Sequence, residues 1–93
     1  MARPYKPRII KFNPNVTYFK PRAVPLSKLE EVYLSVDELE SIRLHDLNDC
    51  NQTNCAQKME ISPSTFQRIL TFANKKIAQA LTEGKAIKIS KKI

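Results

Sequence analysis

Apolar residues recur at helical spacing through the middle of the chain, where the first of three predicted helices lies. At about 100° per residue, the apolar positions from 36 to 47 share one broad face: Val36, Leu39, Leu44 and Leu47. Ser35 and Glu38 have the spacing of a capping box at the start of this helix. Glu40 and Arg43 stand three residues apart, so we expect them to pair with each other. His45 falls opposite Leu47 and is expected to point outward.

Two further helices follow, separated by a short turn. Asn51 can cap a helix over 52–59, on which Cys55, Ala56 and Met59 share one face. Ser62 and Pro63 predict the start of a long helix, and Gly84 predicts its end. Apolar residues line one side of this long helix: Phe66, Ile69, Leu70, Ala73, Ile77, Ala80 and Leu81. Two helices joined by a turn, with a small residue at 56 and an apolar one at 61, are typical of a helix-turn-helix.

Extended segments are expected at both ends of the chain. Five of the six prolines lie within residues 1–25, which disfavours helix there. Short strands are predicted at 8–12, 16–19, 31–34 and 85–89, and the last could pair with 31–34 or 8–12, in the same chain or in a partner. The predicted fold is therefore mainly α. A helix-turn-helix core at 35–83 follows an extended, basic, proline-rich arm at 1–34 and precedes a basic strand and tail at 84–93.

The outward face of the long helix carries the candidate function. Its exposed positions are polar and include no acid: Ser64, Gln67, Arg68, Thr71 and Lys75. A recognition helix in the DNA major groove needs such donors and acceptors, with Gln suited to adenine and Arg to guanine or phosphate. Ser62 and Thr65 add hydroxyls at the start of the helix. An ordinary solvated face remains the alternative, although such faces usually include Asp and Glu.

Charge is distributed unevenly along the chain, whose net charge is +7. Residues 1–22 carry six basic side chains and no acidic one, whereas residues 23–74 carry eight acids and four bases. This distribution suits DNA phosphates at the ends of the chain, and the arm adds three candidate contacts: Arg3, Lys6 and Arg8. The acids of the first helix suggest an alternative, a surface that binds proteins of the transcription machinery such as RNA polymerase: Asp37, Glu38, Glu40, Asp46 and Asp49.

Other functions find little support in the composition. One histidine and one glycine make His-dependent catalysis and a glycine-rich phosphate loop poor candidates, so we expect no enzyme and no cofactor. His45, Cys50 and Cys55 supply at most three metal ligands, fewer than a structural zinc site requires. Two cysteines, no signal peptide and no membrane-spanning run indicate a reduced, cytoplasmic protein. Cys50 could be an exposed redox-sensitive thiol.

The sequence also resembles a known family of small prokaryotic proteins predicted to bind DNA. The resemblance rests on these segments: Met1–Pro4, Val16–Pro21, Val24–Leu26, Leu29–Val32, Asp37–Leu44, Asp46–Leu47, Ser62, Thr65–Phe66, Arg68–Leu70 and Gly84–Ala86. It implies a helix-turn-helix like region four of the sigma factors, in a winged-helix-like setting. The chain departs from the family pattern in three places, with Glu60 and Gln67 where glycine is usual and Pro63 where arginine is frequent. Some relatives carry a domain resembling iron–molybdenum cofactor proteins, to which nothing here corresponds.

Together these observations predict a sequence-specific DNA-binding protein that regulates transcription. A homodimer is expected, because two half-sites double the few base contacts that one helix-turn-helix can make. The apolar arm and the last strand also offer more apolar surface than a small monomer can bury.

Overall fold

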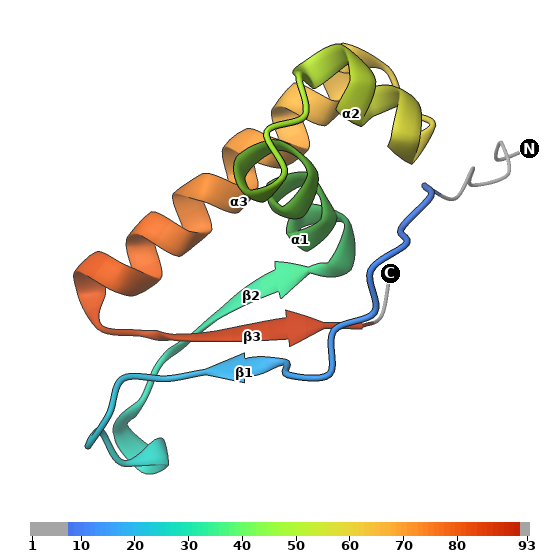
Figure 1. The fold of residues 1–93 in the computed structure, drawn as a ribbon. Helices are drawn as coiled ribbons and strands as arrows, with labels where there is room; N and C mark the ends of the chain where they lie inside the picture. Colours follow the sequence, from blue (N-terminus) through green and yellow to red (C-terminus); the bar gives the residue numbers. More distant parts are fainter. Residues whose placement is uncertain (1–7, 92–93) are drawn as a thin grey trace, which may run out of the picture.

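The fold combines three α-helices with a small mixed sheet in a computed structural model that describes residues 8–91. The helices are α1 (Val36–Ile42), α2 (Gln52–Met59) and α3 (Pro63–Glu83), and the strands are β1 (Tyr18–Phe19), β2 (Glu31–Ser35) and β3 (Ala86–Ser90). A short 3₁₀ turn, η1, covers Leu26–Lys28, and a π-helical turn, η2, covers Arg43–Leu47. About half of the chain is helical, and the helices lie on one side of the sheet (Figure 1).

The sheet has the strand order β1-β3-β2, so β3 lies at its centre. β3 runs parallel to β2, with Glu31 opposite Ala86, and antiparallel to β1, with Tyr18 opposite Lys88. The predicted pairing of the last strand with 31–34 is therefore confirmed, within the same chain. The prediction of a strand at 8–12 is wrong, because the backbone N–H groups of Ile9 and Lys11 bond to helices instead.

The capping box at Ser35 is confirmed, but the helix it starts ends in an unexpected way. Ser35 Oγ accepts from the Glu38 N–H, and the Glu38 carboxylate accepts from the Ser35 N–H at 2.9 Å. After Ile42 the backbone widens into η2, where each residue turns through less than 100°. As a result Leu47, expected in the core, is 74% exposed, and the half-buried His45 ring lies 6.4 Å from the Phe66 ring. The predicted positions of Leu47 and His45 were both wrong for this reason.

The bounds predicted for α2 and α3 are confirmed by their caps. Asn51 accepts from the Asn54 N–H, Ser62 accepts from the Thr65 N–H, and Gly84 adopts a left-handed conformation after α3. Phe66, Leu70 and most of the other predicted apolar positions of α3 are buried. Leu81 is the exception at 75% exposed, because it borders a hollow that Phe19 and Ile87 also line but that no element fills.

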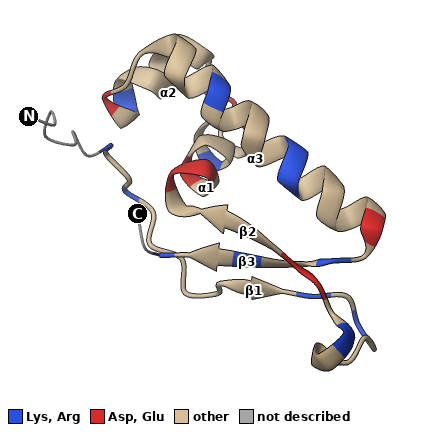
Figure 2. Cartoon of the chain, turned by 180° about the vertical axis from the view of Figure 1, so that it is seen from behind, with Lys and Arg blue, Asp and Glu red and all other residues tan. Residues whose placement is uncertain are grey.

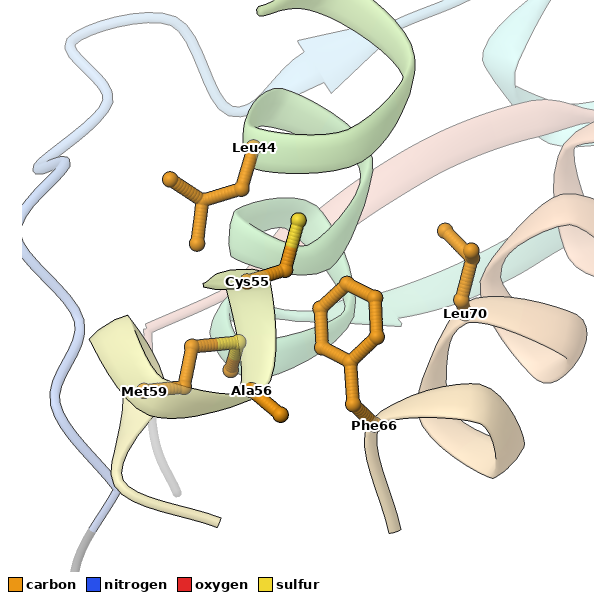
Figure 3. Close-up of a cluster of buried hydrophobic side chains, with 6 residues drawn as sticks. All are labelled: Leu44, Cys55, Ala56, Met59, Phe66 and Leu70. Atoms are coloured by element: carbon orange, nitrogen blue, oxygen red, sulfur yellow. The ribbon is translucent and has the colours of Figure 1, made fainter. Parts of the chain in front are cut away.

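Two clusters of buried side chains form the core. The first joins η2 to α2 and α3 (Figure 3): Leu44, Cys55, Ala56, Met59, Phe66 and Leu70. The second joins α1 and α3 to the sheet: Leu34, Val36, Ala73 and Ile89. Ile42 packs against both clusters. These contacts fix the first half of α3 against α2, and they leave the opposite side of α3 uncovered.

Candidate nucleic-acid interface

The uncovered side of α3 brings together the residues predicted to read bases. All five of its predicted positions are exposed: Ser64, Gln67, Arg68, Thr71 and Lys75. The only acid on the helix is its last residue, Glu83. Figure 2 shows basic positions along α3 and an acidic one at its C-terminal end. The first four turns therefore offer a polar surface that does not repel phosphates.

Hydroxyl groups form a small network at the start of α3. Ser62 Oγ accepts from the Thr65 N–H at 3.1 Å and donates to Thr65 Oγ1 at 2.9 Å. Ser64 Oγ lies 3.2 Å from the same Ser62 oxygen. Ser62 is thus engaged as a cap, and Thr65 is half-buried. Of the three predicted hydroxyl contacts at the start of α3, Ser64 is the most available to a ligand.

Two cations on this face are free of acidic partners. Within residues 8–91 neither Arg68 nor Lys75 has an ion pair, although the neighbouring Lys76 binds Glu38 at 2.8 Å. Gln67 Nε2 donates to Thr71 Oγ1 at 3.3 Å, which orients its amide along the outside of the helix. The face thus combines unpaired positive charge with an oriented amide.

The turn between α2 and α3 is closed by backbone hydrogen bonds. Glu60, which stands where the resembled family usually has glycine, is left-handed, with φ 57° and ψ 46°. The Ile61 N–H donates to the Ala56 carbonyl at 3.0 Å, and the Glu60 N–H donates to the Gln57 carbonyl at 3.1 Å. This is a Schellman motif, and Ile61 packs against the first core cluster as the motif requires. The turn therefore sets the start of α3 rigidly against α2.

Sequence reasoning missed two features of this surface. The exposed face of α2 is also polar and free of acid: Thr53, Asn54, Gln57 and Lys58. The absence of acids from 50 to 59 was a signal for it in the sequence. Phe72 is 54% exposed on α3. On a helical wheel Phe72 lies at about 240° from Phe66, next to Arg68. Helical spacing could therefore have predicted that Phe72 is exposed.

The basic residues predicted as DNA contacts in the N-terminal arm do not lie on the face of α3 in the described structure. Arg3 and Lys6 lie outside the described residues. Arg8 forms an ion pair with Asp37 at 3.4 Å, at the start of α1. The structure therefore does not place Arg8 among the cations of α3.

The acids of the first helix are mostly engaged within the chain. Glu40 is 2% exposed and accepts from Arg43 Nε at 2.7 Å and Nη2 at 2.8 Å, which confirms the predicted pair. Burial raises the pKa of Glu40, but hydrogen bonds from Arg43 and from the backbone at residues 11 and 12 outweigh it, and the pKa is lowered. Glu38, also buried, binds Lys76. Only Asp46 and Asp49 remain exposed on this segment.

The two cysteines lie beside each other, at the start of α2. Cys55 is fully buried, and its thiol donates to the Cys50 carbonyl at 3.1 Å. Burial and the neighbouring Cys50 raise the pKa of Cys55 to about 12, so its thiol stays protonated at neutral pH. Across the described part of the chain, no three His, Cys, Asp or Glu side chains group closely enough to hold a metal ion. A membrane-spanning helix is likewise not found among residues 8–91.

Comparison with known proteins finds relatives that match almost the whole of this chain. Residues 1–91 match the family described as "Protein of unknown function DUF134". A UPF0251 protein of Caldanaerobacter subterraneus subsp. tengcongensis is 56% identical over 89 residues, covering 96% of this chain and 75% of that protein. No solved structure matches the chain.

Two further relatives are longer than this chain. The UPF0251 protein of Halothermothrix orenii is 52% identical over 88 residues, covering 95% of this chain and 65% of its own length. The UPF0251 protein of Desulforudis audaxviator is 54% identical over 89 residues, covering 96% of this chain and 58% of its own length. The chain thus spans between 58% and 75% of the length of these three relatives.

Proposed function

The chain belongs to the DUF134 family, and we propose that it is a sequence-specific DNA-binding protein that regulates transcription. In this proposal α2, the turn at residues 60–62 and α3 form a helix-turn-helix, and α3 enters the major groove. Its role is binding rather than catalysis, in the cytoplasm. The observation that carries the proposal is the exposed, acid-free face of α3, on which Arg68 and Lys75 have no ion-pair partner among residues 8–91.

The chemistry of this face assigns a role to each part. Gln67 can donate to N7 and accept from N6 of adenine, and Arg68 can donate to guanine or to a phosphate. Phe72 offers an apolar contact for a thymine methyl group. Lys75 lies two turns beyond Arg68 on the same side of α3 and suits a phosphate of the backbone that borders the groove.

The face of α2 supports the same orientation. In a helix-turn-helix the first helix crosses the DNA backbone while the second enters the groove. The exposed side chains of α2 are hydrogen-bonding groups and one cation, which suit phosphate oxygens: Thr53, Asn54, Gln57 and Lys58. Because the turn is closed by the Schellman motif, contacts from α2 would fix the register of α3 on the bases.

We also propose that the protein binds as a homodimer on two half-sites. One α3 offers few base contacts, and a second copy doubles them. The competing proposal, a module that binds RNA polymerase through the acids of the first helix, gains no support from the geometry. Three of those five carboxylates are occupied by Arg8, Lys76 and Arg43.

The test is selection of bound duplexes from a random pool, followed by titration of the selected duplex and a scrambled one. The proposal expects enrichment of one motif, tighter binding to it than to the scrambled duplex, and weaker binding to both as salt rises. Light scattering on the selected complex checks for two copies per duplex. A pool that shows no enrichment, with no salt-dependent binding, contradicts the proposal.

A further inference from the structure

Cys50 and Cys55, here called the cysteine pair, occupy the two positions of a hydrophobic staple at the start of α2. Asn51 is the N-cap of α2, so Cys50 is the residue before the cap and Cys55 is the fourth residue of the helix. Side chains at these two positions often pack against each other and fix the angle at which the chain enters the helix. The proposed function makes no use of this pair.

Hydrogen bonds and packing hold the two cysteines against each other. The Cys50 N–H donates to the Leu44 carbonyl at 3.0 Å, and the Cys55 thiol donates to the Cys50 carbonyl at 3.1 Å. Cys55 belongs to the first core cluster, as Figure 3 shows, and Cys50 packs against the same cluster. Burial, and after it a hydrogen bond with the Cys50 side chain, raise the pKa of Cys55 to about 12. The two sulfur atoms are therefore close neighbours.

The two thiols differ in their access to solvent. Cys55 is fully buried, whereas Cys50 is half-buried in the loop between η2 and α2. Oxidation of a thiol depends on its exposure and on how readily it loses its proton. Cys55 is inaccessible and stays protonated at neutral pH. A small oxidant in solution therefore meets Cys50 first, with a second thiol beside it.

We propose that the cysteine pair is an oxidation site, at which a peroxide converts the two thiols into an intrachain disulfide. With hydrogen peroxide, the Cys50 sulfur first attacks one peroxide oxygen, the O–O bond breaks, and a sulfenic acid forms on Cys50 as water leaves. The Cys55 sulfur then attacks the sulfenic sulfur, the S–O bond breaks, and the Cys55 proton leaves with the hydroxyl group as a second water. The two thiols lose two electrons and two protons, and the peroxide accepts them.

The loop before α2 can supply the movement that the bond requires. Two sulfur atoms must approach from van der Waals contact to a bond length of about 2 Å. Cys55 is fixed in the core, whereas Cys50 follows Asp49, which is left-handed with φ 58°. The disulfide joins this loop to the first turn of α2. The inference does not depend on DNA binding, so the two proposals can fail separately.

The experiment treats the folded parent protein with hydrogen peroxide and then measures its mass and its free thiols after denaturation. The sequence contains two cysteines, so N-ethylmaleimide should label two thiols before oxidation and none after it. The intact mass should fall by two hydrogen atoms, and dithiothreitol should restore both thiols. Three results would overturn the proposal: two thiols that survive peroxide, a disulfide between two chains, or a sulfinic acid on Cys50 beside an unoxidised Cys55.

A matched pair of variants tests which sulfur reacts first. Cys55→Ala leaves only the half-buried thiol, and Cys50→Ala leaves only the buried one. With peroxide, Cys55→Ala should form a sulfenic acid that dimedone captures, whereas Cys50→Ala should remain almost unlabelled. Thermal melts show whether each variant folds; if Cys55→Ala does not, because of the gap it leaves in the core, the result on the parent protein decides the test. Equal labelling of two folded variants would contradict Cys50 as the first sulfur to react.

Discussion

The charged side chains of α1 and those on the outward side of α3 differ in whether they have ion-pair partners within the described part of the chain. On α1 and its extension, Asp37, Glu38 and Glu40 each have a cationic partner within the chain. On the outward side of α3, Arg68 and Lys75 have no such partner among the described residues. The difference indicates that the acids of α1 hold the fold together, whereas the cations of α3 are available to another molecule.

The two regions should therefore respond differently to mutation. Loss of a charge on α1 should act on stability, and loss of a charge on α3 should act on binding. Lys76 marks the boundary between them, because it lies on α3 but pairs with Glu38. The predictions that follow test this division, beginning with the largest expected effect.

Glu40→Ala should lower the free energy of unfolding by about 3 kcal/mol, because it leaves Arg43 and the Lys11 N–H without their buried acceptor. Urea denaturation measures the change. Lys75→Ala is the control from the other region and should stay within about 0.5 kcal/mol of the parent. Equal losses for the two variants would remove the distinction between the regions.

Acid should weaken the α1 region first. The pKa of Glu40 is lowered in the fold, so its contribution to stability is complete above the ordinary carboxyl pKa of 4.5 and is lost as pH falls through the lower folded pKa. Glu31 and Glu83 have lowered pKa values too, but Glu31 is only half-buried and Glu83 is exposed, so solvent screens their interactions and both contribute less. Thermal melts between about pH 7 and pH 3 should fall more steeply for the parent than for Glu40→Gln. Parallel curves would mean that Glu40 is not the group responsible.

Glu60→Gly should raise the free energy of unfolding by about 1 kcal/mol, because glycine adopts the left-handed conformation at this turn without a steric cost. For a domain of this size the melting temperature should rise by roughly 4–8 °C. The change also removes a negative charge near α3, so binding to random duplexes should tighten. A lower melting temperature would show that the side chain contributes a contact that outweighs the strain.

Features that depend on neighbours in sequence could be predicted, whereas long-range contacts, apart from the pairing of the last strand with 31–34, could not. The caps at Ser35, Asn51 and Ser62 involve residues three positions apart, so sequence patterns identified them. Residues 8–12 were mistaken for a strand because the acceptors of their backbone N–H groups, on Met59 and Glu40, are far away along the chain. The apolar residues at 9, 10 and 12, which suggested a strand, give no sign of these partners.

The same limit applies to the site. Helical spacing predicted which residue types lie on the outward face of α3. It did not predict which of the charged side chains are engaged in ion pairs within the chain. The ion pairs of Lys76 with Glu38 and of Arg8 with Asp37 depend on the tertiary fold, and they decide which charges remain free. Leu47 is exposed and His45 is half-buried, contrary to expectation, because the π-helical turn changes the angle at which each of its residues leaves the helix.

The central claim is that the outward face of α3 reads DNA, and paired titrations of Gln67→Ala and Arg68→Ala test it most directly. Each variant is titrated at one fixed salt concentration with the selected duplex and with a random one. Gln67→Ala should cost about 1–3 kcal/mol on the selected duplex and almost nothing on the random one, whereas Arg68→Ala should weaken both. If Gln67→Ala weakens both duplexes equally, Gln67 reads no base. If neither variant changes binding while both keep the parent's melting temperature, α3 is not the recognition helix and the central claim is wrong.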